Sequence, residues 1–320
     1  MDEPDEVTEF AAVAAVGGRG VVRKYGGGIY EVRLEDGSVV ESRLRGRLKL
    51  EQRIGDAVAV GDRVEIRAHA DGGYTIEAVA ARESQLARRS PGSGGRRAKV
   101  IVANVDQVVI VVAAARPEPH LRMLDRFLVL CEANFLSAVI VVNKADLVPE
   151  DALRARFAPY EAAGYRVVRC SVLEGSGVEE VGALLCGRTS VLTGPSGVGK
   201  SSLLNRIQPG LQLRTGEVSE AVGKGQHTTV SAELIPLECG GYVADTPGLR
   251  EVGLWEVPLQ ELDTFFPEFE PYLGQCRFTR NCTHTHEPDC AISDAVAAGD
   301  IDAERYQSYR LLLQGDDTRS

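Results

Sequence analysis

Apolar runs alternate with helical stretches over residues 100–256, and this pattern predicts a parallel sheet covered by helices on both faces. Buried strands are expected at 105–114, 138–142, 165–170 and 189–193, followed by strands at 230–237 and 241–244. Helices are expected between them, at about 121–135, 149–163, 178–185 and 202–207. Residues 100–256 are therefore predicted to form an α/β domain.

The preceding residues, 13–82, show short segments in which apolar and polar positions alternate. Asp36-Gly37 lies between two such runs and predicts a hairpin, while Gly61-Asp62 and Gly72-Gly73 mark further turns. These features predict a small β-barrel of the OB-fold type. Residues 1–12 are acidic and lack periodicity, so a disordered tail is expected there.

The barrel and the residues after it also differ from the rest of the chain in charge. The chain carries a net charge of −10, which argues against uniform attraction to nucleic acid. Residues 83–99 are rich in Pro, Gly and Ser and are predicted to be a flexible basic linker. The cations of the barrel and linker form either a solvated surface or a surface for a phosphate backbone. They are Arg19, Arg23, Lys24, Arg43, Arg45, Arg47, Lys49, Arg88, Arg89, Arg96, Arg97 and Lys99.

Composition narrows the class of protein. A chain of 320 residues with 44% hydrophobic residues has room for two or three domains with proper cores. No apolar run approaches the roughly 20 residues of a membrane span, and the acidic start is the reverse of a secretory signal. A soluble cytoplasmic protein is expected. Seven cysteines make a disulfide framework unexpected, and Cys131, Cys170, Cys186 and Cys239 are predicted to be small buried side chains.

A phosphate-binding motif occupies Gly194 to Ser201, GPSGVGKS, with a predicted strand before it and a predicted helix after it. The spacing fits a Walker A loop, in which main-chain N–H groups and a helix N-terminus surround phosphate oxygens. Lys200 is predicted to reach the β- and γ-phosphates, and the Ser201 hydroxyl to bind Mg²⁺.

A guanine-specifying motif, Asn143-Lys144-Ala145-Asp146, ends the predicted strand at 138–142. The Asp146 carboxylate can accept hydrogen bonds from both N1–H and the 2-amino group of guanine, whereas adenine offers no such donor pair. Lys144 is expected to lie over the base plane and Asn143 to join neighbouring loops. Ser171-Val172 is predicted to meet the guanine carbonyl oxygen through a main-chain N–H.

Two further nucleotide motifs follow the Walker A loop. Residues 223–229, GKGQHTT, are suited to a mobile loop, and Asp245-Thr246-Pro247-Gly248 follows the last strand. Asp245 can hold Mg²⁺ through water, and the Gly248 N–H can sense a γ-phosphate. In ordinary GTPases the Walker A loop comes first and the guanine motifs follow the DxxG motif. Here the guanine motifs precede the Walker A loop, which predicts a circularly permuted GTPase domain.

Residues 257–320 contain a candidate zinc site in a domain predicted to be helical. Cys276, Cys282, His284 and Cys290 supply three thiolates and an imidazole, a set that suits tetrahedral Zn²⁺. His286 competes with His284 as the fourth ligand. Four protein ligands leave no open coordination position, so a structural role is expected.

The barrel, the permuted motifs and the CxxxxxCxHxxxxxC pattern together resemble the RsgA family of small-ribosomal-subunit biogenesis GTPases. The resemblance implies binding of the small ribosomal subunit and its rRNA late in maturation, slow GTP hydrolysis that the subunit stimulates, and release on hydrolysis. It favours His284 as the zinc ligand and Thr228 or Thr229 as the Mg²⁺ ligand. A monomer without membrane contact and salt-sensitive binding through the barrel, the linker, Arg277 and Arg280 are expected. The expected nucleotide-binding residues are Asn143, Lys144, Asp146, Ser171, Val172, Gly194, Pro195, Ser196, Gly197, Val198, Gly199, Lys200, Ser201, Ser202, Asp245 and Gly248.

The catalytic group is the least determined feature. Leu249 stands where many GTPases carry a water-positioning Gln, and its apolar side chain cannot orient water. Our hypothesis is that His227 orients the water, while Thr228, Thr229 and Lys200 are the other residues expected to act in catalysis; the alternative is that His227 is a solvent-facing loop histidine. Two other functions remain: a non-enzymatic RNA-binding module stabilised by nucleotide, and a small-metabolite kinase, which the guanine motif disfavours.

Overall fold

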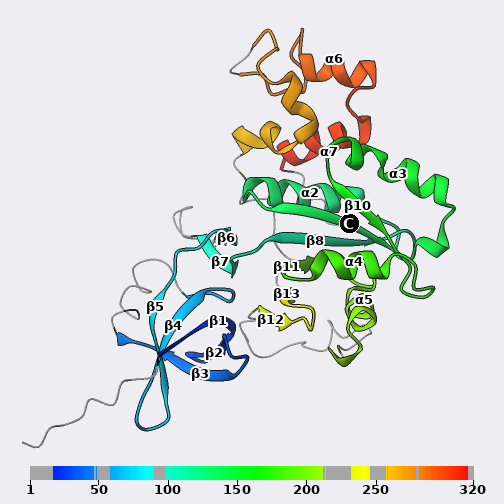
Figure 1. The fold of residues 1–320 in the computed structure, drawn as a ribbon. Coiled ribbons are helices and arrows are strands. Elements are labelled where there is room, and N and C mark those ends of the chain that lie inside the picture. Colours follow the sequence, from blue (N-terminus) through cyan, green and yellow to red (C-terminus); the bar gives the residue numbers. More distant parts are fainter. Residues whose placement is uncertain are drawn as a thin grey trace, which may run out of the picture.

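The computed structural model describes residues 17–46, 48, 58–89, 98–211, 213, 232–245, 257, 259–278 and 281–315. Three parts follow one another along the chain, a β-barrel, an α/β domain and a helical module (Figure 1). The tail predicted at 1–12 lies outside the described residues.

The N-terminal part is a closed five-stranded barrel. Its strands are β1 (Gly17–Gly26), β2 (Ile29–Leu34), β3 (Val39–Leu44), β4 (Arg63–Ala68) and β5 (Tyr74–Val79). Antiparallel pairs join β1 to β2, β2 to β3, β4 to β5 and β1 to β4, and a parallel pair of β3 with β5 completes the circle. Alternate residues point inward and fill the barrel with apolar side chains, including Val22, Tyr30, Val32 and Ile76. The predicted barrel is confirmed.

The predicted flexible linker is in part a β-ladder, which corrects the expectation for residues 83–99. Strand β6 (Gln85–Arg89) pairs antiparallel with β7 (Ala98–Ala103), and residues 90–97 lie outside the described residues. Leu86 pairs with Val102, and both side chains are buried in the core of the α/β domain. The polar composition concealed this strand because only one of its large side chains is apolar.

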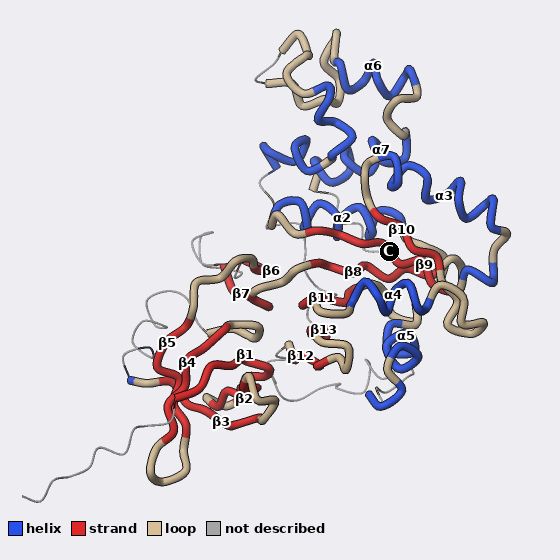
Figure 2. Tube along the Cα trace, viewed as in Figure 1, coloured by secondary structure: helices blue, strands red, loops and turns tan. Residues whose placement is uncertain are grey.

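The α/β domain has a central sheet with strand order β10-β9-β8-β11-β13-β12 (Figure 2). These strands are β8 (Gln107–Ala113), β9 (Ser137–Asn143), β10 (Arg166–Arg169), β11 (Arg188–Thr193), β12 (Glu233–Pro236) and β13 (Gly241–Asp245). Strands β10, β9, β8, β11 and β13 are parallel, and β12 runs antiparallel to β13. A short 3₁₀ turn, η1 (Ala145–Leu147), follows β9.

Helices cover both faces of this sheet, as predicted. Helices α2 (Leu121–Ala133) and α3 (Glu150–Ala162) bury Leu128 and Phe157 on one face. Helices α4 (Val178–Leu185) and α5 (Lys200–Ile207) bury Val181 and Leu203 on the other, and η2 (Pro209–Leu211) follows α5. The two apolar cores lie on opposite sides of the parallel strands.

The C-terminal module packs against α2, at the opposite end of the molecule from the barrel (Figure 1). It consists of the 3₁₀ segments η5 (Leu259–Phe265) and η6 (Pro267–Tyr272) and the helices α6 (Ala291–Ala298) and α7 (Ala303–Leu313). Val129 of α2 is fully buried in the core of this module, together with Phe266 and Phe269. The Asp302 carboxylate caps α7 by accepting from the main-chain N–H groups of Glu304 and Arg305.

The prediction for the scattered cysteines is correct for two and wrong for two. Cys131 and Cys170 are buried thiols, whereas Cys186 and Cys239 form a disulfide with a Cα–Cα distance of 5.3 Å. The sheet brings their turns together, since the Gly187 N–H donates to the Gly240 carbonyl oxygen at 2.9 Å. A cross-link between residues 53 positions apart stabilises the fold by about 4 kcal/mol, because it lowers the conformational entropy of the unfolded chain.

Among the residues that the structure describes, no helix combines the length and apolar character that crossing a bilayer requires.

Candidate nucleotide and metal sites

The phosphate-binding loop joins the C-terminal end of β11 to the N-terminus of α5. Gly194 and Gly199 have φ angles of 134° and 95°, in the region that favours glycine. A Cβ atom at Gly194 would lie 2.0 Å from the Val111 carbonyl oxygen, and one at Gly199 would lie 2.4 Å from Asn143 Nδ2. Gly194 and Gly199 are therefore required by close packing against neighbouring segments as well as by their dihedral angles.

Lys200 is folded back onto this loop. Its Nζ donates to the carbonyl oxygens of Gly194 at 2.7 Å and Pro195 at 2.6 Å. Ser201 and Ser202 follow in the first turn of α5, where helix N–H groups have no helical acceptor. The loop thus combines a cation, main-chain donors and a hydroxyl at one place, the set that a nucleoside triphosphate with Mg²⁺ requires.

Asn143 joins the three loops that surround the expected base site. This buried side chain donates through Nδ2 to the Val198 carbonyl oxygen at 2.8 Å. Its Oδ1 accepts from the main-chain N–H of Val172 at 3.3 Å. The expectation that Asn143 connects neighbouring loops agrees with these bonds.

Asp146 is held by the neighbouring loop. The Ser171 hydroxyl donates to Asp146 Oδ1 at 2.5 Å and accepts from the Glu174 N–H at 3.1 Å. Asp146 is exposed, whereas Ser171 is fully buried. The carboxylate is therefore oriented from the protein interior, and its solvent-facing side is open to a ligand. The Val172 N–H, expected to meet guanine, donates to Asn143 instead, and guanine must share or replace that bond.

Two contacts of Lys144 were not foreseen from the sequence. Its ammonium donates to the carbonyl oxygen of Gly197 at 2.8 Å and to that of Arg116. Arg116 lies 28 residues earlier, after β8, and no local signal links it to the guanine motif. Lys144 therefore connects three segments of the site, whichever way it meets a base.

The remaining predicted nucleotide residues are only partly described. Asp245 ends β13 and is paired in register with Leu192 of β11, one residue before Thr193 and two before Gly194. This register brings the Asp245 main chain close to the phosphate loop. His227, Thr228, Thr229 and Gly248 lie outside the described residues.

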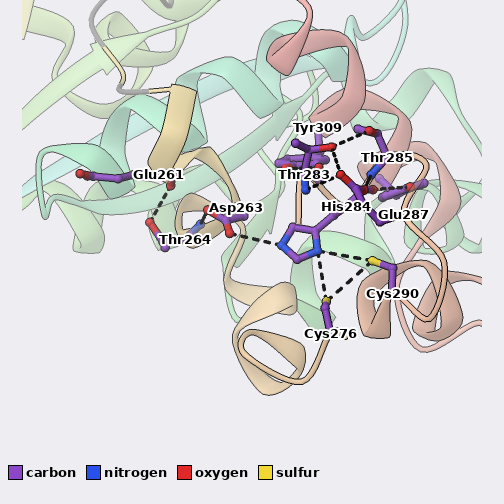
Figure 3. A network of polar contacts seen from close by, with 11 residues as sticks. Glu261, Asp263, Thr264, Cys276, Thr283, His284, Thr285, Glu287, Cys290 and Tyr309 are labelled. Carbon is purple, nitrogen blue, oxygen red and sulfur yellow. Dashed lines mark hydrogen bonds and ion pairs between the residues drawn. The ribbon is translucent and has the colours of Figure 1, made fainter. Parts of the chain in front are cut away.

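Three thiols and an imidazole converge in the C-terminal module. Figure 3 shows the His284 ring beside the Cys276 and Cys290 sulfurs. The ligand atoms of Cys276, Cys282, His284 and Cys290 all lie within 4.8 Å of one another. Cys276 Sγ is 3.9 Å from Cys290 Sγ and 3.5 Å from His284 Nδ1, and His284 Nδ1 is 3.4 Å from Cys290 Sγ. Tetrahedral Zn–S bonds of 2.3 Å place sulfurs about 3.8 Å apart, so the residues fit a zinc ion.

The structure distinguishes the two candidate histidines. His284 is buried and directs Nδ1 toward the sulfurs, while its Nε2 lies 3.3 Å from Asp263 Oδ2. A carboxylate behind a histidine ligand fixes the ring and raises its basicity. His286 is exposed, with Nδ1 2.8 Å from the Thr285 hydroxyl, and stands outside the cluster. Asp263 was missed by sequence reasoning because it lies 21 residues before His284.

The loop between the ligands is ordered by Glu287. Partial burial alone would raise the pKa of Glu287, but hydrogen bonds from the Thr283 hydroxyl and several main-chain N–H groups lower it far below the usual range. Tyr306 and Tyr309 donate to the carbonyl oxygens of His284 and Thr283 and tie the loop to α7. The cluster is therefore supported from two sides.

Removal of zinc is expected to unfold this module while the α/β domain stays folded. His284→Ala should lose its stoichiometric zinc and expose residues 257–320 to protease, because a structural zinc supplies much of the folding free energy of so small a unit. Zinc content and limited proteolysis measure both effects. His286→Ala is the matched control, and loss of zinc from His286→Ala with retention in His284→Ala would contradict the assignment.

Comparison with known proteins gives a consistent result. The family model described as RsgA GTPase matches residues 79–255. The small ribosomal subunit biogenesis GTPase RsgA of Gemmatimonas aurantiaca is 53% identical over 292 residues, covering 91% of this chain and 94% of that protein. The protein of the same name from Moorella thermoacetica is 45% identical over 293 residues, covering 92% of this chain and 95% of that protein.

Solved structures agree with this similarity. YjeQ from Thermotoga maritima superposes with a TM-score of 0.76 at 36% identity, covering 95% of this chain and 100% of that one. YloQ, described as a circularly permuted GTPase, superposes with a TM-score of 0.73 at 31% identity, covering 95% of this chain and 96% of that one. The similarity therefore includes the barrel and the cysteine-rich module as well as the α/β domain.

Proposed function

The chain belongs to the RsgA GTPase family, and from this premise we propose that it hydrolyses GTP during late maturation of the small ribosomal subunit. In this proposal the GTP-bound protein binds the subunit and its rRNA, the subunit stimulates hydrolysis, and the GDP-bound protein leaves. It acts in the cytoplasm as a monomer.

The observation that carries the proposal is the arrangement of side chains from three loops around Asn143 and Asp146. Asn143 bonds the phosphate loop and the Ser171-Val172 loop at once, and Ser171 holds the Asp146 carboxylate. A carboxylate fixed in this way selects guanine over adenine because adenine cannot supply the two donors. The order of the strands that carry these groups, with β9 before β11, is that of a circularly permuted GTPase.

Two metal ions fit the residues. Ser201 and Asp245 offer a hydroxyl and a carboxylate of the kind that Mg²⁺ prefers, and either Thr228 or Thr229 would complete the set. Mg²⁺ neutralises charge that develops on the phosphates during transfer. A zinc ion held by Cys276, Cys282, His284 and Cys290 would have a structural role, because four protein ligands leave no coordination position open.

The barrel offers fewer unpaired cations than its composition suggests. Arg19 is paired with Glu65, Lys24 with Glu233, and Arg45 with Glu77. Arg43 is exposed and has no ion pair among the described residues. We infer that rRNA binding by the barrel still involves phosphate contacts and is sensitive to salt, because ion pairs between exposed side chains are weak.

Hydrolysis measured with and without purified small ribosomal subunits tests the proposal. Small subunits should raise GTP turnover, while large subunits should not, and ATP should remain unhydrolysed. Flat turnover with retained subunit binding would overturn the proposal in favour of an RNA-binding protein in which nucleotide only stabilises the fold, an alternative raised by Leu249.

We expect His227→Ala to lower subunit-stimulated kcat by about 100-fold, the scale of a lost proton-transfer or water-positioning group. GTP affinity should stay close to that of the wild type, because the base and phosphate contacts are made by other loops. Gln226→Ala is the neighbouring control. Stimulated turnover that survives His227→Ala would remove His227 from the mechanism.

A further inference from the structure

The barrel and the α/β domain share one continuous sheet. Strand β1 of the barrel pairs antiparallel with β12 at Lys24 and Glu233, so that eleven strands form a single hydrogen-bonded series (Figure 2). The backbone pairing at this junction is short: among the described residues, it joins Lys24 to Glu233. Side chains must therefore supply much of the contact.

A β-bulge in β1 supplies these side chains. Val22 pairs with Val32 and Lys24 with Glu31, which leaves Arg23 as the extra residue of β1. Consecutive residues of a regular strand point to opposite faces, and a bulge re-aims one of them. Here both Arg23 and Lys24 reach β12.

The contacts of the two cations differ in kind. Arg23 is mostly buried, and its Nε donates to the main-chain carbonyl oxygen of Leu234 at 3.2 Å while its Nη1 pairs with Glu31 at 3.3 Å. Lys24 Nζ lies 3.1 Å from Glu233 Oε2, with both side chains partly exposed. Arg23 thus fixes the backbone of β12, and Lys24 fixes its first residue.

Strand β12 is also the neighbour of the strand that carries the expected Mg²⁺ residue. Glu233 pairs in register with Asp245 of β13, and Asp245 pairs with Leu192 of β11. One row of residues therefore runs from Lys24 in the barrel through Glu233 to Asp245. Adjacent strands are about 4.8 Å apart, so Lys24 and Asp245 are separated by about 10 Å in this row.

We propose that the junction of Arg23 and Lys24 with β12 couples the RNA-binding state of the barrel to GTP hydrolysis. The proposal rests on the function proposed above. A barrel held by rRNA fixes β1, β1 fixes β12, and β12 sets the main-chain position of Asp245 beside the phosphate loop. Coupling between two binding sites is reciprocal in free energy, so where rRNA bound at the barrel changes nucleotide affinity, bound nucleotide also changes β1.

Charge reversal tests the coupling. Glu233→Lys should lower subunit-stimulated kcat, measured at saturating subunits, by about tenfold, within the range usual for coupling between sites. Hydrolysis without subunits and GTP affinity should be unchanged. Adding Lys24→Glu restores the shorter of the two ion pairs in reverse and should restore part of the stimulation, because Arg23 Nη2, which lies 4.0 Å from Glu233 Oε1, still faces the new lysine. Failure of Glu233→Lys to reduce stimulation, or failure of the double variant to exceed the single one, would overturn the proposal.

Glu65→Lys is the matched control. This variant makes the same change of charge and also breaks an ion pair with β1, since Glu65 of β4 pairs with Arg19 of β1 at 3.4 Å. Both residues of this pair belong to the barrel, so the junction with β12 is left intact. Stimulated kcat should be retained in Glu65→Lys. A loss equal to that of Glu233→Lys would mean that barrel integrity alone matters and would overturn the role of the junction.

Hydrogen exchange of β1 amides provides a test without ribosomes. In the wild type, exchange over residues 21–26 should differ between the complexes with a non-hydrolysable GTP analogue and with GDP, and Glu233→Lys should abolish the difference. Identical exchange in both states would overturn the coupling. Absence of subunit stimulation in the wild type would instead overturn the proposed function.

Discussion

Asp146→Asn is expected to lower the affinity for GTP by about 10⁴-fold and to transfer preference to xanthosine triphosphate. An amide oxygen still accepts from N1–H, but the amide N–H₂ now faces the 2-amino group of guanine, leaving two donors opposed. Xanthine carries a carbonyl oxygen at that position and accepts the new donor. The Ser171 hydroxyl, which donates to Asp146 Oδ1, can continue to orient the side chain.

Competition binding with a fluorescent nucleotide measures both affinities. Asp151→Asn, in the first turn of α3, makes the same chemical change outside the site and should leave both affinities unaltered. Equal weakening of GTP and xanthosine triphosphate binding by Asp146→Asn would indicate damage to the pocket and not a change of recognition.

Arg305→Met is expected to reduce the free energy of unfolding by about 3–5 kcal/mol, because it leaves two carboxylates buried without a counter-charge. Arg305 Nη1 donates to Asp125 Oδ1 at 2.7 Å, and its Nε and Nη2 donate to Glu268 at 2.7 and 2.9 Å. The Arg305 and Asp125 side chains are each 2% exposed. Burial alone would lower the pKa of Arg305, but the two carboxylates raise it, so the guanidinium stays charged.

Acid should reduce this loss of stability. Burial already raises the pKa of Asp125 above its usual value despite Arg305, and removal of the cation raises it further. A carboxyl whose pKa is higher in the folded than in the unfolded protein binds protons more tightly when the protein is folded. Its contribution to the free energy of unfolding is therefore retained at low pH and lost as pH rises through the folded pKa. The deficit of Arg305→Met should therefore be smaller at pH 5 than at pH 8.

Urea unfolding at the two pH values measures this prediction. Arg310→Met changes the same residue type on α7, where Arg310 lies over the Tyr306 ring, and should cost far less. Adding Asp125→Leu to Arg305→Met should recover part of the stability, since one unpaired charge is removed. A deficit in Arg305→Met no larger than that in Arg310→Met would contradict the assigned role.

The parts of the fold that sequence could predict are those determined by local pattern. Period-two alternation indicated the barrel, and the apolar pattern located β8, β9 and β11 to within two residues. The phosphate loop, the guanine motif and the zinc ligands are short motifs whose spacing carries their chemistry. Their detection required no knowledge of which strands lie side by side.

What sequence could not predict depends on distant partners. Asp125 and Arg305 are 180 residues apart, and each alone predicts an exposed charge. Cys186 and Cys239 lie in two turns that only the sheet order brings together. The strand at 85–89 was hidden because its stability comes from pairing with β7 and not from its own composition. Arg23, grouped with cations expected to face either solvent or a phosphate backbone, instead bonds to Leu234 of β12 and Glu31 of β2.

The position of β1 beside β12 also affects the tendency of the chain to self-associate. Without the barrel, β12 would be the outermost strand of the sheet, with its unpaired N–H and C=O groups open to another molecule, and such edges promote self-association. The Leu234 carbonyl oxygen, now an acceptor for Arg23, would be among the groups exposed. The barrel therefore also protects the sheet against aggregation, and a truncated chain that begins at residue 79 is expected to oligomerise through β12.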